Sequence, residues 1–266
     1  MPTAPIGLVP GVGRFVLNCD RSAGVRMDWT FADAVEAGMV ADAAARAEVD
    51  LRVEDWPVRD QGTTGACVGF AAADGVLHWH YRQAGLLAGG ERPSPRFIWM
   101  ANKETDLLAS FPTTFIESAG TQIKLALRVA RKYGCVTEST LPMDGALSSL
   151  STEAFYARAA KYRIASYHNL GRDPERWRAW ISNQGPVLVR VVVDRTWERA
   201  AAAEGELDRY REDASGGGHA ACLVGYTGTH FIVRNSWGER WGDGGFAYAS
   251  DAYAASAFDE AYGAVL

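Results

Sequence analysis

The chain has 266 residues, of which 48% are hydrophobic, so it is long enough to build one large domain or two subdomains around a sizeable core. Its formal net charge of −5 is small and charges of both signs are interspersed, which argues against a nucleic-acid partner and against an anionic membrane surface. No apolar stretch approaches the ~20 residues that a membrane-spanning helix needs.

The first part of the chain predicts an extension followed by helices. Residues 1–46 are interrupted by Pro, Gly and Arg, unlike a signal peptide, and their Ala-rich part predicts one or two helical turns. We therefore expect a cytoplasmic protein, or one exported without a signal peptide. The main domain is expected at 47–266, with a helical half at about 55–145. Helices are predicted at 67–86, 94–103 and 120–134, and a loop at 104–119.

The second part, from about 146 to 266, predicts a β-rich half. A short capped helix at 173–185 is followed by β-branched or aromatic runs separated by turn residues. Helices first and short strands second indicate an α+β protein of two subdomains, with an active site expected between them. The strands are predicted at 186–194, 219–226, 229–236 and 245–250.

Cysteine usage indicates neither a metal site nor a disulfide framework. The four cysteines are widely spaced, with no CxxC pair and no Cys/His cluster. We therefore expect reduced thiols, no metal and no other cofactor. Cys135 and Cys222 are interpreted as core thiols, and the pattern assigns no role to Cys19.

Cys67, in QGTTGACVGF, raises two interpretations. Free cysteine is among the most buried residue types, so Cys67 could be a core thiol. At the start of the expected helix 67–86, however, the unpaired N–H groups and the helix dipole would favour a thiolate. A cysteine nucleophile also needs a base, a group that orients the base, and donors for the oxyanion.

The rest of the chain offers a candidate for each of these partners. His219 opens one predicted strand and Asn235 ends the next, so an antiparallel hairpin would bring them together. Gln61, six residues before Cys67, can direct its amide toward the expected start of the helix and supply a second oxyanion donor beside the Cys67 N–H.

Three motifs in this order, QGTTGAC, GHAACLVGY and NSWGERWGDGGF, resemble the papain-like cysteine peptidases, and the likeness extends over about residues 48–250. It implies a two-subdomain fold with a helical half, an antiparallel β-rich half and an active-site cleft between them. It also implies that Cys67 is the nucleophile, His219 the base and acid, Asn235 the orienter of the imidazole and Gln61 the oxyanion-hole donor.

Two positions depart from the family pattern. Thr64 stands where the family has a cysteine that forms a disulfide, and Val68 stands where an aromatic residue is usual. The absent bridge agrees with a reducing compartment. We expect altered packing at the head of the helix, with the catalytic roles unchanged.

The resemblance further implies that substrate is bound by Arg190, Gly120, Gly218 and Trp237, of which Trp237 would also cover the Asn235–His219 hydrogen bond. Arg190 falls where the family's second specificity pocket is lined, normally by a small or apolar residue. One hypothesis is that Arg190 selects an acidic or polar side chain. The alternative is that its guanidinium reaches the surface or pairs with a neighbouring carboxylate.

The predicted function is a monomeric cysteine endopeptidase that cleaves a polypeptide substrate through a thioester acyl-enzyme. Two other functions stay open: an acyl transferase or peptide ligase with the same thiol, and a catalytically silent binding homologue. For residues 1–46, both an inhibitory pro-segment and a surface-packed arm remain open. Asp74, a carboxylate inside the apolar helix, is expected to make a structural hydrogen bond.

Overall fold

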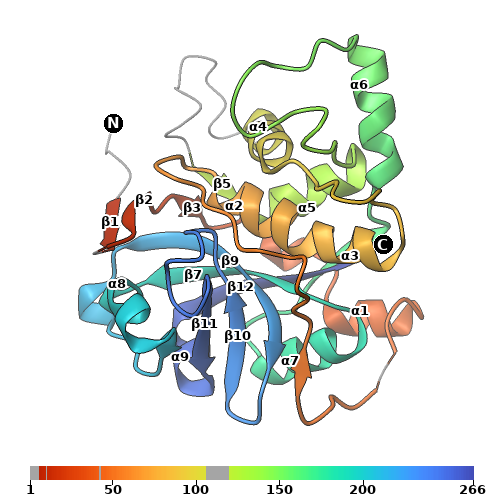
Figure 1. Cartoon of the computed structure of the whole chain (residues 1–266). Coiled ribbons are helices and arrows are strands. Elements are labelled where there is room, and N and C mark those ends of the chain that lie inside the picture. Colours follow the sequence, from red (N-terminus) through yellow and green to blue (C-terminus); the bar gives the residue numbers. More distant parts are fainter. Residues whose placement is uncertain (1–5, 10, 42, 106–119) are drawn as a thin grey trace.

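The computed structural model describes residues 6–9, 11–41, 43–105 and 120–266. The helices α2 to α6 form one half of the molecule and a curved sheet forms the other (Figure 1). This arrangement confirms the α+β fold predicted from the order of the elements. None of the described helices is long and apolar enough to cross a membrane.

The helical half is built around one continuous buried helix. It consists of α2 (Cys67–Gly69), a π-helical segment (Phe70–Leu77) and α3 (His78–Gln83), so the predicted helix 67–86 is confirmed but ends three residues earlier. Gly75 lets this helix approach the sheet, because a Cβ there would lie 2.9 Å from the Cβ of Cys222.

The other helices of this half follow their predicted caps. In α4 (Pro95–Thr105), the Ser94 hydroxyl accepts a hydrogen bond from the Phe97 N–H at 3.1 Å, as a helix N-cap does. Helix α5 (Ile123–Lys132) ends before Gly134, whose φ of 91° suits a helix C-terminus. The sequence did not predict α6 (Thr152–Ala159). Residues 104 and 105 of the expected loop belong to α4, and 106–119 lie outside the described residues.

The other half is an eight-stranded sheet with the order β6-β12-β7-β9-β10-β11-β8, in which β4 also pairs with β9. All four predicted strands are present as β7, β9, β10 and β11, whereas β4, β6, β8, β12 and the helix before β12 were not predicted. Every pairing in this sheet is antiparallel except that of β11 with β8. The strands are β4 (Val49–Asp50), β6 (Ser166–Asn169), β7 (Val187–Val193), β8 (Glu206–Leu207), β9 (Gly217–Tyr226), β10 (His230–Arg234), β11 (Phe246–Ser250) and β12 (Phe258–Val265).

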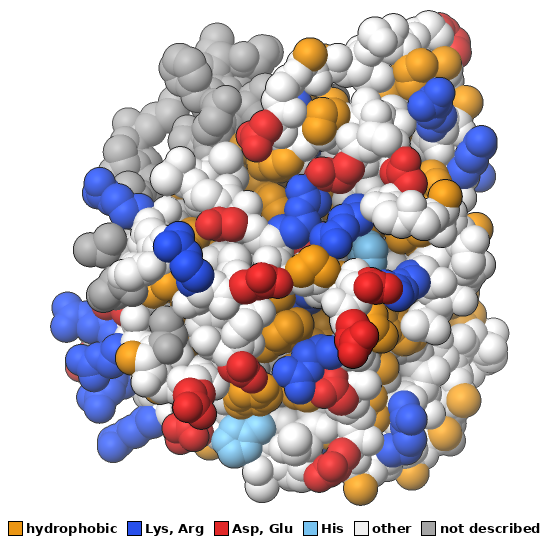
Figure 2. Space-filling model, in the orientation of Figure 1, with side chains coloured by type: hydrophobic (Ala, Val, Ile, Leu, Met, Phe, Trp, Pro, Cys, Tyr) orange, Lys and Arg blue, Asp and Glu red, His pale blue; other side chains and the backbone are white. Residues whose placement is uncertain are grey.

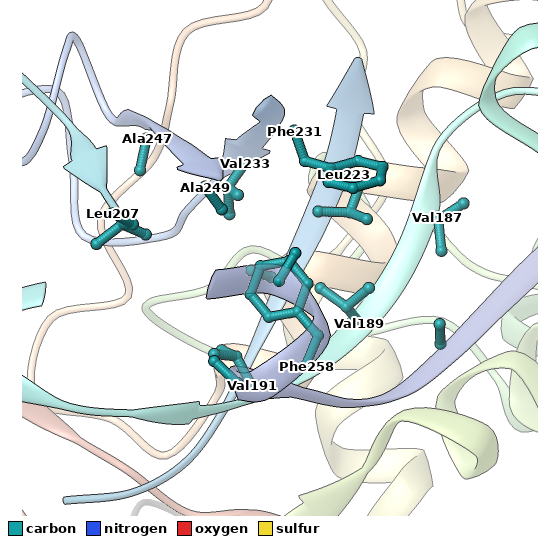
Figure 3. Close-up of a cluster of buried hydrophobic side chains, with 14 of the residues drawn as sticks. Val187, Val189, Val191, Leu207, Leu223, Phe231, Val233, Ala247, Ala249 and Phe258 are labelled. Atoms are coloured by element: carbon teal, nitrogen blue, oxygen red, sulfur yellow. The ribbon is translucent and has the colours of Figure 1, made fainter. Parts of the chain in front are cut away.

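Each face of this sheet supplies a different hydrophobic core. Along β7, Val187, Val189 and Val191 belong to one cluster, whereas Leu188 packs with the helical half, which is the period of two expected of a strand. Figure 3 shows the first cluster, where these valines meet Leu223 and Phe258. The outer face of the sheet is covered by α7 (Pro174–Asn183), α8 (Arg195–Arg199) and α9 (Asp251–Ala257).

The N-terminal residues lie along the junction of the two halves. Strands β1 (Ile6–Val9) and β2 (Gly13–Val16) form a hairpin, and β3 (Cys19–Asp20) pairs in parallel with β5 (Thr121–Gln122) (Figure 1). The predicted helical turns are present as α1 (Phe31–Glu36). Short 3-10 turns occupy Val25–Met27, Ala160–Tyr162, Ala200–Ala203 and Glu212–Ala214.

Charged side chains of both signs occur on the face of the molecule drawn in Figure 2. Basic and acidic side chains are interspersed over its central part, and several basic side chains lie together at its left edge. This distribution agrees with the interspersed charges of the sequence.

Candidate active site

Cys67 opens the central helix and is completely buried. The loop before it is a tight turn: Gly62 has a φ of 59°, and the Thr64 hydroxyl donates to the Gln61 carbonyl at 2.7 Å. Thr64 thus holds the turn by a hydrogen bond where the family has a disulfide. Val68 is completely buried in the core of the helical half, where it fills the position that is usually aromatic.

Both polar atoms of the Gln61 side-chain amide form hydrogen bonds that fix it at this turn. Its Oε1 accepts a hydrogen bond from the Ser236 hydroxyl at 2.7 Å, and its Nε2 donates to the Thr64 carbonyl at 2.9 Å. An amide nitrogen carries two hydrogens, so Nε2 keeps a second donor for an oxyanion. Ser236 follows Asn235 directly, and this contact was not foreseen from the sequence.

His219 and Asn235 are joined as the predicted hairpin requires. Asn235 Oδ1 lies 2.7 Å from His219 Nε2, which leaves Nδ1 as the second imidazole nitrogen. The Trp237 ring centroid lies 4.9 Å from that of His219, and Trp237 is only 1% exposed, so it shields this hydrogen bond from water.

Residues 15–20, which we call the covering segment, lie over these groups. Asn18 accepts a hydrogen bond from the Cys67 thiol, with Sγ and Oδ1 3.9 Å apart, and forms an isolated parallel bridge with Gly218. Phe15 stacks on Trp237 with ring centroids 4.5 Å apart. The segment therefore contacts the nucleophile candidate in one half and the residues around His219 in the other.

Gly120 and Gly218 make room for the covering segment. A Cβ on Gly120 would lie 2.3 Å from the Asn18 carbonyl oxygen, and one on Gly218 would lie 2.1 Å from the Cys19 carbonyl oxygen. Neither position can carry a side chain while an extended chain lies there. Both were predicted to bind substrate, and in this structure both contact the chain's own N-terminal residues.

Two peptide carbonyls of the covering segment accept hydrogen bonds from Thr121 and Arg190. The Asn18 carbonyl accepts from the Thr121 N–H at 3.3 Å, and the Cys19 carbonyl accepts from Arg190 Nε at 2.8 Å. A carbonyl must reach the oxyanion donors to be attacked. These two carbonyls are therefore held by donors other than the proposed oxyanion donors, Gln61 Nε2 and the Cys67 N–H.

Arg190 is buried and its charge is paired. Its Nη1 lies 2.5 Å from Asp259 Oδ2, and both side chains are about one-tenth exposed. The guanidinium therefore pairs with a carboxylate, as one of the two interpretations of the sequence expected. The pairing with Asp259, near the C-terminus, could not be read from the sequence.

Burial keeps both candidate reactive groups uncharged. It raises the pKa of Cys67 to about 11, although the N–H of Ala220 opposes this shift. It lowers the pKa of His219 to about 4, opposed by the hydrogen bond that the imidazole donates to Asn235 Oδ1. In the covered state, then, the thiol and the imidazole are both neutral at pH 7. The start of the Cys67 helix contacts β9, the strand that carries His219.

No group of three or more His, Cys, Asp or Glu side chains within the described ranges is arranged to hold a metal ion. The other three cysteines are free and buried, and Cys135 and Cys222 lie in the core of the helical half.

Comparisons with known proteins agree on one family. Residues 107–260, more than half of the chain, match the family described as "Papain family cysteine protease"; this range contains His219 and Asn235 and begins after Cys67. Mouse cathepsin K is 27% identical over 218 residues, which cover 75% of this chain and 58% of cathepsin K, so the chain spans less than two thirds of that relative. An uncharacterized peptidase C1-like protein of Acanthamoeba polyphaga mimivirus is 26% identical over 223 residues, covering 75% of this chain and 67% of that protein.

Solved structures give the same fold. The structure of xylellain, a cysteine protease from Xylella fastidiosa, superposes with a TM-score of 0.77 at 19% identity and covers 100% of this chain and 98% of that one. Digestive procathepsin L 3 of Tenebrio molitor superposes with a TM-score of 0.65 at 19% identity, covering 94% and 76%. With its papain-like α+β fold, the chain belongs to the papain family of cysteine proteases.

Proposed function

We propose that the chain is a cysteine endopeptidase in which Cys67 attacks the carbonyl carbon of a peptide bond. His219 takes the thiol proton and delivers it to the leaving amine, and Asn235 orients the imidazole. The oxyanion is stabilised by Gln61 Nε2 and the Cys67 N–H. Water, activated by His219, then hydrolyses the thioester.

The observation that carries this proposal is the Asn235–His219 hydrogen bond, on a strand that contacts the start of the Cys67 helix. Since Nε2 is used by Asn235 at 2.7 Å, Nδ1 is the nitrogen left to act on the thiol. Nδ1 is completely buried and has no hydrogen-bond partner among the described residues. A buried polar atom without a hydrogen bond destabilises the fold. The unpaired Nδ1 therefore supports the proposal that this nitrogen takes the proton of the Cys67 thiol in the active state.

We further propose that the described state is latent. Asn18 takes the hydrogen bond of the thiol, and Phe15 covers Trp237. Displacing residues 15–20 would let water reach Cys67 and His219, so that the thiolate and imidazolium forms become accessible. In this proposal Gly120, Gly218 and Trp237, vacated by the covering segment, bind the polypeptide substrate.

The test uses the full-length chain with two substitutions, Phe15→Asp and Leu17→Asp. Both residues are buried, so the charges should keep the covering segment from docking. We expect this variant to cleave casein and to be labelled at Cys67 by a peptidyl epoxide, and the added change Cys67→Ala to abolish both. Absence of labelling and cleavage in the opened variant would overturn the proposal, and mass spectrometry of the products separates hydrolysis from acyl transfer.

A further inference from the structure

Arg234 is a buried arginine at the end of β10, directly before Asn235, and it is 2% exposed. Its Nη1 donates to the Trp56 carbonyl at 2.8 Å, and its Nη2 donates to the Pro57 carbonyl at 2.8 Å and to Asp74 Oδ2 at 2.7 Å. The guanidinium carbon also lies 4.4 Å from the centroid of the Trp56 ring.

These bonds reach the chain segments that carry the proposed catalytic residues. Asp74 belongs to the helix that begins at Cys67, and Trp56 and Pro57 belong to the loop that leads to Gln61. Arg234 is itself next to Asn235, and in the sheet it is paired with Cys222 of β9, the strand that carries His219. Arg234 therefore links all of these segments: its guanidinium contacts the loop and the helix, and its backbone pairs with β9.

The chemistry of the contact requires an arginine and a carboxylate. Asp74 is 3% exposed, and a buried carboxylate is stable only when it is paired and hydrogen-bonded. A planar guanidinium can donate in three directions at once, whereas the ammonium of lysine cannot reproduce that geometry. Asp74 also lies within the π-helical segment, a rare geometry that is frequent at functional sites.

We propose that Arg234 and Asp74 are positioning residues that set the spacing between the Cys67 thiol and the His219–Asn235 pair. This inference rests on the proposed peptidase function. Catalysis by the thiol needs the imidazole at hydrogen-bond distance, and a displacement of 1 Å can lower the rate by about 10²-fold. Neither side chain is proposed to contact substrate. The pair affects catalysis only by holding the two halves of the molecule, and with them Cys67 and His219, at a fixed separation.

The experiment compares two arginines in the full-length Phe15→Asp/Leu17→Asp chain. Arg178 is the matched control, because it is buried, lies 2.5 Å from Asp251 and stacks over Phe231 at 4.6 Å. It links α7 to α9 and has no role in the proposed site. The variants are Arg234→Lys, Asp74→Asn and Arg178→Lys. Each is assayed for kcat, KM, thermal unfolding, and the pH dependence of Cys67 alkylation by iodoacetamide.

We expect all three variants to lose thermal stability. Only Arg234→Lys and Asp74→Asn should lower kcat tenfold or more with KM within twofold, and shift the onset of alkylation to higher pH. Arg178→Lys should keep kcat and the alkylation profile. An unchanged kcat and profile in a folded Arg234→Lys or Asp74→Asn chain would overturn the inference.

Two further outcomes are separable. If the parent chain cleaves no peptide, the proposed function fails, but the alkylation profile still tests positioning because it needs no substrate. If Arg234→Lys does not fold, Asp74→Asn decides, because it keeps the size of the side chain and removes only the charge.

Discussion

The Cys67 thiol donates a hydrogen bond to Asn18 Oδ1 at 3.9 Å, and Asn18 lies in the covering segment, 49 residues before Cys67 in the chain. The nucleophile candidate and the imidazole of His219 are thereby buried together, and each is held in its neutral form. In this state the thiol has a hydrogen-bond partner that is not its proposed base.

Removing the covering segment should lower the pH at which Cys67 reacts. Only the thiolate is alkylated, and burial raises the pKa of Cys67 to about 11, so the wild-type chain should react with iodoacetamide only at strongly alkaline pH. In the Phe15→Asp/Leu17→Asp chain, the solvated thiol can pair with protonated His219, and alkylation should begin below pH 8. The rate is followed by mass spectrometry between pH 5 and 11.

Cys135 provides the internal control for that measurement. It is buried in the core of the helical half, and its pKa is raised to about 12 by burial. Its alkylation should stay slow in both chains. Equal Cys67 profiles in the wild-type and opened chains would contradict the latent state.

Gln61 should contribute to kcat and not to KM. Because its amide is proposed to bind the oxyanion only as it forms, Gln61→Ala in the opened chain should lower kcat by about 10²- to 10³-fold. Ser236→Ala removes the 2.7 Å bond that fixes Gln61 Oε1, so a smaller loss of about tenfold is expected. Steady-state kinetics on one peptide substrate checks both, with Thr64→Ser as a control that keeps the hydroxyl. A Gln61→Ala chain with kcat within threefold of its parent would rule out this role.

Much of the candidate site could be predicted because its signals are local in sequence. QGTTGAC places Gln61 and Cys67 around one turn, and two strands with a short connection bring His219 to Asn235. The same holds for the fold, since caps at Ser94 and Asp173 and the alternation along β7 mark their elements directly.

The covering segment and the Arg234 contacts could not be predicted, because they depend on packing between distant parts of the chain. Arg234 and Asp74 are 160 residues apart. One signal was present: Phe15, Val16, Leu17 and Cys19 form a short apolar run that contains a β-branched residue, as in a buried strand. Such a run predicts an extended segment, but it does not predict which surface of the protein that segment covers.

Asp259 should prevent Arg190 from selecting acidic substrate side chains, because it pairs with the Arg190 charge. The Arg190 charge is paired with Asp259, and its Nε binds a backbone carbonyl of the covering segment. We therefore expect the opened parent chain to have no acidic preference two residues before the cleaved bond, and Arg190→Ala to raise KM without changing the preference. Asp259→Asn should instead create an acidic preference at this position, because it removes the carboxylate that is hydrogen-bonded to the guanidinium. A peptide library compares the three chains, and loss of an acidic preference in Arg190→Ala alone would favour the specificity hypothesis.

Acid should destabilise the folded chain through its buried histidines. Burial lowers the pKa values of His80 and His219 to about 4, against about 6.5 in an unfolded chain. Because the folded state disfavours the proton, this contribution to stability is complete above pH 6.5 and is lost as the pH falls toward 4. His80→Phe removes one such proton site away from the proposed catalytic residues. Between pH 7 and pH 4, the free energy of unfolding of this variant should therefore fall by about 2 to 3 kcal/mol less than that of the wild type.

The measurement is the free energy of unfolding in urea at pH 7 and at pH 4. His80 is 6% exposed and its Nε2 has no hydrogen-bond partner among the described residues, so phenylalanine can replace the ring without leaving a polar group unpaired. His230→Gln, at a partly exposed histidine beside Asp208, is the control and should follow the wild-type slope. If His80→Phe loses as much stability between pH 7 and 4 as the wild type does, then protonation of this buried imidazole is not what acid acts on.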